Sequence, residues 1–372
     1  MTTRRLSFIV TKKGKNSVKE MPEFNKIKDS KRILFVHQFL AMGDAVLLSP
    51  VYKTIKDNIQ GIDISVLTNE YSMPFVQAIP FVDHVYPLES IFRRGASRVE
   101  VFLRLCMFFI KNRTDTIVLR GDKRLPQRVF NLAAKICLLK TISMGSYLEE
   151  EVSESRHIVE VYFRILEKLG FEVKERGRLC LTLPDSALSE AKAFLGNVNR
   201  KLAGIAPVSN IKIKNWSPEK TAELINKLKE LSYDVVLFCT DTEIFGKVHD
   251  LTGNSALVVG RVDFPLLMGI VSSCKIFIGV DTGPTHLAAA IGVPTVGLYG
   301  PTSGTVAGPY SKKGTYVQSS VACSYYNPLA LFSPKERPMA CYLEGCCKLP
   351  ANNCMDGITI EEVMEAVYRI IQ

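Results

Sequence analysis

Two short stretches of the sequence combine residue types that can move a proton and hold an anion. Met42-Gly43-Asp44 follows one apolar run, and Asp281-Thr282-Gly283-Pro284 follows another. The aspartate of the first stretch is either a general base or the cap of the helix that follows. In the second stretch a helix start with free N–H groups suits a phosphate, and His286 adds a donor or a charge. An ordinary strand–turn–helix unit carries the same pattern, so both interpretations stay open here.

Both stretches need a sheet that presents them at one edge. The apolar runs that predict strands lie at 32–36, 63–68, 84–88, 116–119, 179–184, 202–206, 235–238, 258–260, 276–280 and 295–299. Helical patterns lie between them at 45–55, 73–78, 153–169, 186–195, 218–231, 265–272 and 285–290, and a last one covers 358–371. This alternation favours an α/β fold with parallel, doubly wound sheets.

Length and composition are those of a globular protein with two domains. The chain has 372 residues, of which 47% are hydrophobic and 23% charged. No apolar run reaches the ~18–20 residues that a membrane span needs. The start of the chain has too short an apolar core for a signal peptide. Ten cysteines without an export signal indicate free thiols in a reducing cytoplasm.

Positive charge is concentrated in two segments of the first half. Residues 1–32 carry ten basic and three acidic residues, within a net charge of +10 for the chain. Such a leader is either a solvated tail or a contact for an anionic membrane face. Residues 91–113 mix arginines with a helical apolar face of Phe102, Leu105, Phe108 and Phe109. That face either packs on the sheet or meets a membrane or a lipid-linked ligand. We expect no nucleic-acid partner, because no known binding motif is visible.

Further candidate binding residues follow the ends of other predicted strands. A basic cluster of Arg120, Lys123 and Arg124 follows the strand at 116–119, where α/β sheets place ligands. Lys214, with Ser209 before it, lies in the loop after 202–206, which is expected on the same side as Asp281. The strand at 235–238 leads to Asp241-Thr242-Glu243, in which Glu243 is a candidate for a ribose hydroxyl. This triplet is also similar to a metal-binding Asp-x-Asp pattern, which is common by chance.

A group of cysteines near the end of the chain raises the question of a metal. Five lie within about thirty residues, and clustered thiolates are ligands for zinc or iron–sulfur clusters. They contain no Cys-x-x-Cys pair, so we predict no metal and keep a bound metal as the alternative. The residues are Cys323, Cys341, Cys346, Cys347 and Cys354.

Several of these motifs together resemble glycosyltransferase family 9, the heptosyltransferase family. The similar stretches are Met42-Gly43-Asp44, Lys214-Asn215-Trp216, Asp281 to Ala290 with Gly292-Val293-Pro294, and Tyr299 to Thr302. The resemblance implies the GT-B architecture, with two Rossmann-like domains facing a cleft. It implies Asp44 as catalytic base, and a donor phosphate held by Lys214, Thr282, Gly283, His286 and, more weakly, Ser209. Asp281 would orient the turn or bind a donor-sugar hydroxyl. The family has two glycines where this chain has residues 239–243, so nucleotide contacts there differ.

The expected organisation and activity follow from this resemblance. We expect a basic leader (1–30), an acceptor-binding domain (31–184), a nucleotide-sugar-binding domain (185–357) and a closing helix (358–372). The expected activity is inverting, metal-independent transfer of a sugar from a nucleotide-diphosphate donor, with ADP-heptose and a lipopolysaccharide-core glycan as the family's substrates. No cofactor is expected, and the basic cluster at 120–124 would bind the acceptor. The alternatives are a nucleotide-sugar epimerase, a non-catalytic nucleotide-sugar-binding protein and a metal-based regulatory role. The expected location is cytoplasmic, with the inner face of the cytoplasmic membrane as a variant of it.

Overall fold

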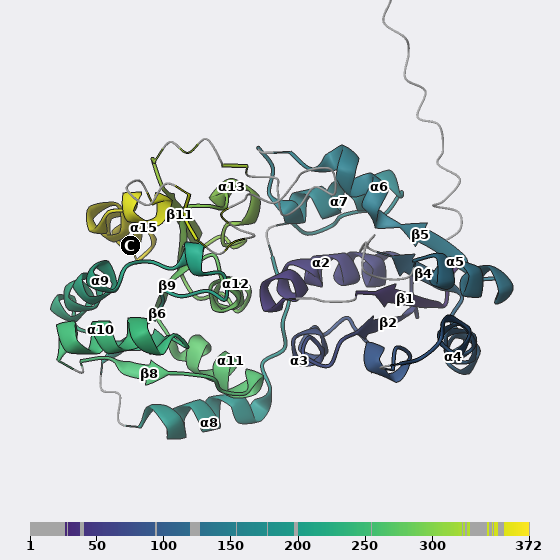
Figure 1. Cartoon of the computed structure of the whole chain (residues 1–372), viewed down its shortest axis with the longest axis horizontal. Helices are drawn as coiled ribbons and strands as arrows, with labels where there is room; N and C mark the ends of the chain where they lie inside the picture. The colour runs from purple at the N-terminus through teal and green to yellow at the C-terminus, as the bar shows by residue number, and fades with distance from the viewer. Residues whose placement is uncertain are drawn as a thin grey trace, which may run out of the picture.

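The computed structural model describes most of the chain. The described residues are 27, 29–37, 41–93, 95–119, 127–153, 155–176, 178–196, 200–253, 255–321, 323, 326–327, 341, 344, 346–348 and 353–371. They form two parallel sheets with helices on their faces (Figure 1).

The first sheet has five strands in the order β3-β2-β1-β4-β5. Its strands are β1 (Arg32–Val36), β2 (Asp63–Thr68), β3 (His84–Pro87), β4 (Thr116–Leu119) and β5 (Lys140–Ser143). All neighbours run parallel. The strand order reverses between β1 and β4, and ligands of such sheets bind beyond the carboxyl ends of the strands at this reversal.

The second sheet has six strands in the order β11-β10-β9-β6-β7-β8. Its strands are β6 (Lys201–Ala206), β7 (Tyr233–Phe238), β8 (Leu257–Val259), β9 (Ile276–Val280), β10 (Thr295–Tyr299) and β11 (Gly314–Gln318). They too are parallel, and here the order reverses between β6 and β9. The two sheets confirm the predicted α/β class with two Rossmann-like halves.

Helices cover both faces of the first sheet. They are α2 (Met42–Asn58), α3 (Met73–Gln77), α4 (Arg98–Lys111), α5 (Gln127–Ile136), α6 (Met144–Glu151) and α7 (Ile158–Lys168), with the 3-10 turn η1 (Leu88–Ser90). Leu34 and Val36 of β1 pack with α4 and α5, whereas Ile33 and Phe35 pack with α2 and α7. Alternate residues of this buried strand therefore pack into the cores on the two opposite faces of the sheet.

The second sheet is covered in the same way. Its helices are α8 (Asp185–Leu195), α9 (Pro218–Glu230), α10 (Thr242–Thr252), α11 (Phe264–Ser273), α12 (Gly283–Ala290), α13 (Gly304–Ala307) and α15 (Ile360–Ile371), with the 3-10 turns η2 (Lys212–Lys214) and η4 (Cys354–Gly357). The closing helix α15 begins after Thr359. Thr359 Oγ1 accepts from the Glu362 amide, and the Glu362 carboxylate accepts from the Thr359 amide, which is a capping box. The predicted last helix at 358–371 therefore begins two residues later, with Thr359 as its cap.

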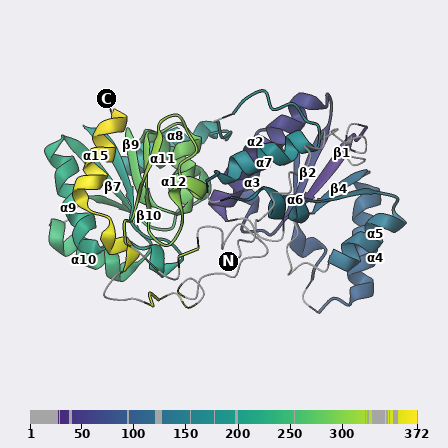
Figure 2. The ribbon, with the colours of Figure 1, turned by 90° about the horizontal axis from the view of Figure 1, so that it is seen from above.

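The two halves share an apolar core. The core of α2 and α7 continues into Leu287 and Ala288 of α12. The rings of Phe75 and Phe264 meet edge to face, with centroids 4.9 Å apart. Figures 1 and 2 show α2 and α12 side by side where the halves meet. The two helix starts that the sequence singled out are thereby brought to one place.

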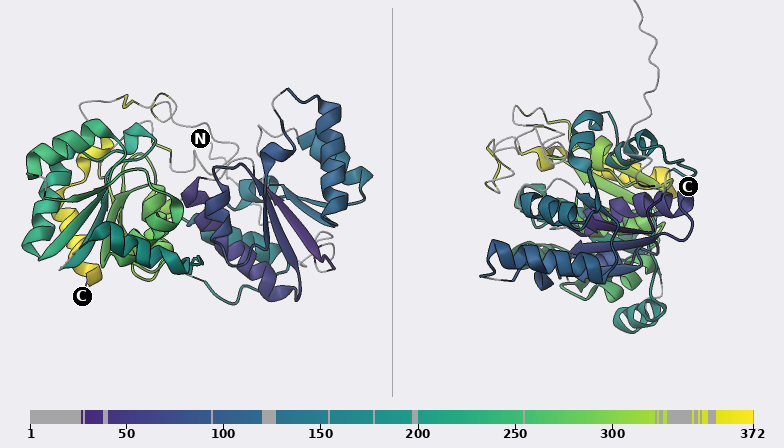
Figure 3. Two further views of the ribbon diagram at one scale, coloured as in Figure 1. Left: turned by 90° about the horizontal axis from the view of Figure 1, so that it is seen from below. Right: turned by 90° about the vertical axis from the view of Figure 1, so that its right-hand side faces the viewer.

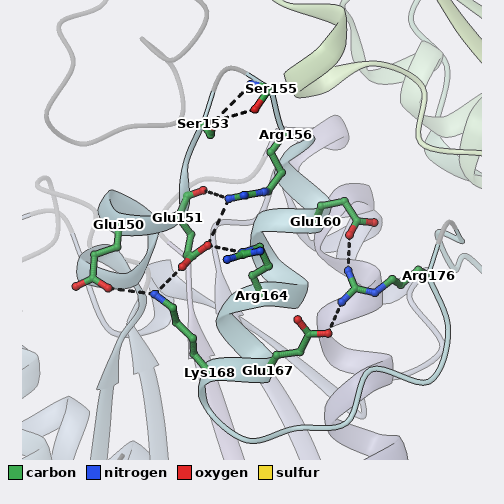
Figure 4. A network of polar contacts seen from close by, with 10 residues as sticks. All are labelled: Glu150, Glu151, Ser153, Ser155, Arg156, Glu160, Arg164, Glu167, Lys168 and Arg176. Atoms are coloured by element: carbon green, nitrogen blue, oxygen red, sulfur yellow. Dashed lines mark hydrogen bonds and ion pairs between the residues drawn. The ribbon is translucent and has the colours of Figure 1, made fainter. Parts of the chain in front are cut away.

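Charged side chains of α6 and α7 form a network beside the segment that leads to the second half (Figure 4). The buried Glu151 carboxylate accepts from Arg164 at 2.6 Å and lies 2.5 Å from the ammonium of Lys168. The hydrogen bond from Lys168 is the main reason that the pKa of Glu151 is lowered. Arg176 lies in the segment that leads to the second half, and it pairs with both Glu160 and Glu167 of α7.

Two sequence predictions are wrong in this region. The predicted strand at 179–184 belongs to neither sheet: Cys180 N donates to Ser49 Oγ at 2.9 Å and Thr182 N to Ala78 O at 2.7 Å. Its apolar residues pack on the first half instead. The predicted helix at 153–169 begins only at Ile158, because His157 caps it. The domain boundary expected between 184 and 185 stays a prediction, with α8 starting there.

Candidate active site

An ion pair lies at the strand reversal of the second sheet. Asp281 follows β9, and Lys214 closes η2 in the loop after β6, the neighbouring strand. The Lys214 ammonium lies 2.7 Å from Asp281 Oδ2 and 3.5 Å from the Asp281 carbonyl oxygen. Both side chains are largely buried, with relative exposures of 9% and 11%. The lysine that was predicted to face the Asp281 turn is thus in contact with it.

His286 is the second partner of the same carboxylate. Its Nε2 lies 3.3 Å from Asp281 Oδ1. An ionised carboxylate only accepts hydrogen bonds, so Nε2 carries a proton and donates it. The buried Nδ1 of His286 has no hydrogen-bond partner among the described residues. A buried nitrogen without a partner is costly, which suits a position where a ligand supplies one.

The charges around Asp281 keep it ionised. Burial alone would raise its pKa, but the charge of Lys214 and the hydrogen bond and charge of His286 outweigh that and hold the pKa well below its usual range. The carboxylate therefore stays negative and balances the buried lysine.

Helix α12 starts directly at this ion pair. Thr282 occupies the N-cap position, yet its side chain makes no capping hydrogen bond. Pro284 lies in the first turn, and Thr285 Oγ1 donates to Val280 O at 2.7 Å, which ties the turn to β9. The Thr282 and Gly283 amides form no backbone hydrogen bond within the described ranges. Such free amides, at the positive end of the helix dipole, favour an anion.

The start of helix α2, in the first half, lies against the start of α12. Its N-cap is Ala41, and Asp44 lies in the first turn, so Asp44 is not the cap. The alternative that Asp44 merely caps α2 is thus wrong, because the backbone turns into the helix before it. Asp44 is half-buried, and its carboxylate makes no hydrogen bond or ion pair within the described part of the chain. The first turn of α2 thus offers an unengaged acceptor.

Two glycines allow the helix starts to touch. A Cβ on Gly43 would lie 2.7 Å from Cδ2 of His286, and one on Gly283 would lie 2.9 Å from the side chain of Met42. At these distances, a side chain at either glycine would force the neighbouring residue to move. The glycines therefore bring Asp44 into the neighbourhood of the Asp281 corner.

Three other predicted residues lie along the same sheet edge. Ser209 organises the loop that carries Lys214: its amide donates to Asn215 Oδ1 at 2.8 Å, and its Oγ accepts from Ile211 N at 3.3 Å. Asp241 caps α10 through the amides of residues 243 and 244. Glu243 is exposed and pairs with Lys247 at 2.9 Å. Its predicted contact with a ribose stays a prediction.

Two residues near the site were missed by sequence reasoning. His157 bridges the halves: its Nε2 donates to Gly308 O at 3.0 Å, and its ring stacks on Tyr310 with centroids 4.7 Å apart. Burial is the main cause that lowers its pKa to about 4, and the nearby His286 adds to it. Gln318 donates to Tyr299 O at 3.0 Å and accepts from Gly304 N at 2.9 Å, which fixes the corner after β10. A lone histidine and a lone glutamine give no pattern that a sequence reading can use.

The remaining predictions concern the basic residues, the clustered cysteines and membrane-spanning helices. The basic cluster of Arg120, Lys123 and Arg124, and nearly all of the leader, lie outside the described residues. The pKa of Cys354 is raised to about 12 by burial and by the nearby thiols of Cys347, Cys323 and Cys341. Within the described ranges, however, no three histidine, cysteine or acidic side chains are arranged to hold a metal ion. None of the described helices is both long and apolar enough to cross a membrane.

Known proteins share this organisation. Residues 143–326 match the model of glycosyltransferase family 9 (heptosyltransferase). Lipopolysaccharide heptosyltransferase 3 of Escherichia coli is 24% identical over 285 residues, which cover 72% of this chain and 84% of the relative. The glycosyl transferase family 9 structure from Veillonella parvula has a TM-score of 0.72 at 19% identity, covering 92% of this chain and 97% of that one. E. coli heptosyltransferase WaaC with ADP has a TM-score of 0.60 at 17% identity, covering 91% and 99%.

The fold is the GT-B architecture, and the chain is a glycosyltransferase. Its residues 143–326 match glycosyltransferase family 9, the family that the motifs around Asp44, Lys214 and Asp281 resemble.

Proposed function

We propose that this glycosyltransferase moves heptose from ADP-heptose to a lipopolysaccharide-core or related glycan, with inversion and without a metal ion. The names of the relatives support the substrates: one is a lipopolysaccharide heptosyltransferase, and another was solved with ADP. The observation that carries the proposal is the buried Lys214–Asp281–His286 group at the start of α12, with the start of α2 in contact with it.

On the donor side, the diphosphate would bind at the start of α12. The amides of Thr282 and Gly283, Lys214 and His286 would stabilise the negative charge that grows on the leaving diphosphate. The Ser209 hydroxyl accepts from Ile211 and can donate its own proton to a phosphate oxygen. Asp281 would keep Lys214 and His286 in place before the donor arrives, or take a donor-sugar hydroxyl. Glu243 remains our candidate for the ribose.

On the acceptor side, Asp44 would act as general base. The acceptor oxygen attacks the anomeric carbon, the bond from that carbon to the diphosphate oxygen breaks, and Asp44 takes the hydroxyl proton. A single displacement inverts the configuration at the anomeric carbon. Asp44 suits this role because the described residues leave its carboxylate unengaged. We assign acceptor binding to the first half, including the basic cluster at 120–124, and place the reaction at the cytoplasmic side of the membrane.

A transfer assay tests this function. The full chain is incubated with ADP-heptose and a heptose-deficient core glycan, and the product is identified by mass spectrometry and its anomeric configuration by NMR. We expect an inverted heptoside, formed equally well in excess EDTA. Release of free sugar or an epimer without acceptor would instead indicate a hydrolase or an epimerase. A strict need for a divalent cation would contradict the proposal that protein groups alone stabilise the leaving diphosphate. A thermal-shift panel of nucleotide sugars should single out the donor, because a ligand stabilises the state that binds it.

A further inference from the structure

Helix α4 has two apolar faces, of which only one is covered. Val101, Leu105 and Phe109 are buried against the first sheet. This confirms that the predicted apolar face packs on the sheet, with Phe102 and Phe108 partly buried beside it. A second row with helical spacing is exposed; its members are Val99, Leu103, Met107 and Ile110. The fold leaves this second row without a partner in the described chain.

Helix α5 extends the exposed row. Leu132, Ile136 and the following Leu138 are exposed as well. The two helices lie against each other on the side of the first sheet that points away from the second half (Figures 2 and 3). The thiols of Cys106 and Cys137 meet between them, and burial followed by this contact raises the pKa of Cys106 to about 11. We name the seven exposed side chains of residues 99–138 the α4–α5 face.

This concentration is not the scatter of apolar residues that any surface shows. The α4–α5 face holds seven of the sixteen large apolar side chains that are exposed among the described residues. Their relative exposures range from 52% to 90%. Exposed apolar side chains gathered on two adjoining helices mark an interaction site.

The charges around the α4–α5 face select the partner. Exposed basic residues surround it: Arg93, Arg98, Lys111, Arg113, Arg128 and Lys135. The described acidic residues of this region already have partners: Glu100 pairs with Arg104 of the same helix at 2.7 Å, and Asp115 accepts the amides of Lys31 and Arg32. Apolar rows flanked by arginine and lysine are the pattern of helices that lie in the interfacial layer of a bilayer, where they gain from anionic lipids.

We propose that the α4–α5 face docks onto an anionic lipid bilayer, with the apolar row in the interfacial layer and the basic rim at the headgroups. The inference deepens the proposed function and rests on it for its purpose, since a lipid-linked acceptor is presented at such a surface. Docking through α4 and α5 leaves the side chains at the starts of α2 and α12 uncovered, because α2 lies on the other face of the first sheet and α12 packs against α2 from the second half.

Vesicle sedimentation with the full chain tests the proposal. The probes are vesicles of phosphatidylglycerol with phosphatidylcholine, and of phosphatidylcholine alone, both without any acceptor glycan. The variant L103S/M107S/I110S should partition about tenfold more weakly to the anionic vesicles, and K111Q/R128Q/K135Q should lose a similar factor. The control L188S/L251S removes equally exposed side chains of α8 and α10, at 52% and 53%, and should bind as the parent does.

A second measurement reports contact directly. Fluorescence of the tryptophan introduced by Ile110→Trp should be quenched by vesicles with brominated acyl chains, whereas that of Leu188→Trp should not. Unchanged partitioning of the first two variants, or an unquenched signal from Ile110→Trp, would overturn the inference and would assign any vesicle binding to the leader. A concentration-dependent dimer that L103S/M107S/I110S abolishes would also overturn it, because a second copy would then be the occupant.

The experiments distinguish a failure of the docking proposal from a failure of the proposed function. Transfer to a delipidated glycan in solution should be unaffected by L103S/M107S/I110S. If the parent transfers sugar but the face variants bind vesicles normally, the docking proposal alone is wrong. If the vesicle results hold and the parent transfers nothing, the proposed function is wrong and the docking face stands.

Discussion

Gly43 and His286 are in contact across the two halves of the molecule, and a Cβ on Gly43 would lie 2.7 Å from Cδ2 of His286. The same imidazole lies 3.3 Å from Asp281. The start of α2 is therefore fitted against a ring that belongs to the proposed phosphate site. Any change at this contact alters how the proposed base and the donor group face each other.

The first prediction concerns this contact. Gly43→Ala should push His286 or separate the helix starts, at a cost of about 1–3 kcal/mol in stability and about 100-fold in kcat/KM. The control is Gly246→Ala in α10, where an added Cβ meets nothing within 4 Å. Steady-state kinetics and urea unfolding of both variants check this. Equal activity of Gly43→Ala and Gly246→Ala would show that the contact has no role in transfer.

The second prediction concerns the buried ion pair. Asp281→Asn leaves the Lys214 ammonium buried without a counter-charge, which should lower the free energy of unfolding by about 3–5 kcal/mol. The double variant D281N/K214Q should recover part of that loss, because the two changes share one interaction. Glu243→Gln, which breaks an exposed pair with Lys247, serves as control and should not measurably change the free energy of unfolding. Additive losses in D281N/K214Q would contradict the pairing.

The third prediction tests the proposed base. Asp44→Asn should lower kcat by about 10²–10⁴-fold, the usual contribution of a general base, while affinity for the nucleotide sugar changes only a few-fold. Asp57→Asn, in the last turn of the same helix, removes a carboxylate that pairs with Lys53 and should leave kcat unchanged. Kinetics together with calorimetric titration separate the two effects. A normal kcat in Asp44→Asn would remove this residue from the chemistry.

The fourth prediction concerns pH. Burial lowers the pKa of His157 from its ordinary value of 6.5 to about 4. Between these two values the unfolded chain binds the proton and the folded chain does not, so stability falls as pH decreases through this window. The loss at pH 4 should approach about 3 kcal/mol. Unfolding titrations of the parent should show this slope, His157→Gln should lack it, and the exposed His249→Gln should retain it. An unchanged slope in His157→Gln would assign the window to other groups.

Much of the fold could be predicted from the sequence, because buried parallel strands read as short apolar runs. The ranges predicted for β1, β2, β4, β9 and β10 match those of the structure. The edge strands β5 and β11 were missed, since Lys140–Ser143 and Gly314–Gln318 are only partly buried and mix polar with apolar residues. The opposite error at 179–184 arose because an apolar segment can pack on a helix without joining a sheet.

The site was predictable in its positions and not in its pairings. Strand ends placed Lys214 and Asp281 on one side of a sheet, and the structure shows them in contact. That Asp281 engages Lys214 and His286 at once depends on the neighbourhood of β6 and β9, which no local pattern contains. The same holds for His157, whose partners Gly308 and Tyr310 lie far along the chain.

The central neighbours β6 and β9 also determine when this site can exist during synthesis. The chain makes β7, α10, β8 and α11 before it returns to place β9 beside β6. A nascent chain that stops at residue 275 already holds Lys214 but has neither Asp281 nor the first turn of α12. Because so distant a pairing must close first, the proposed phosphate site can form only late, once β9 and the start of α12 have left the ribosome.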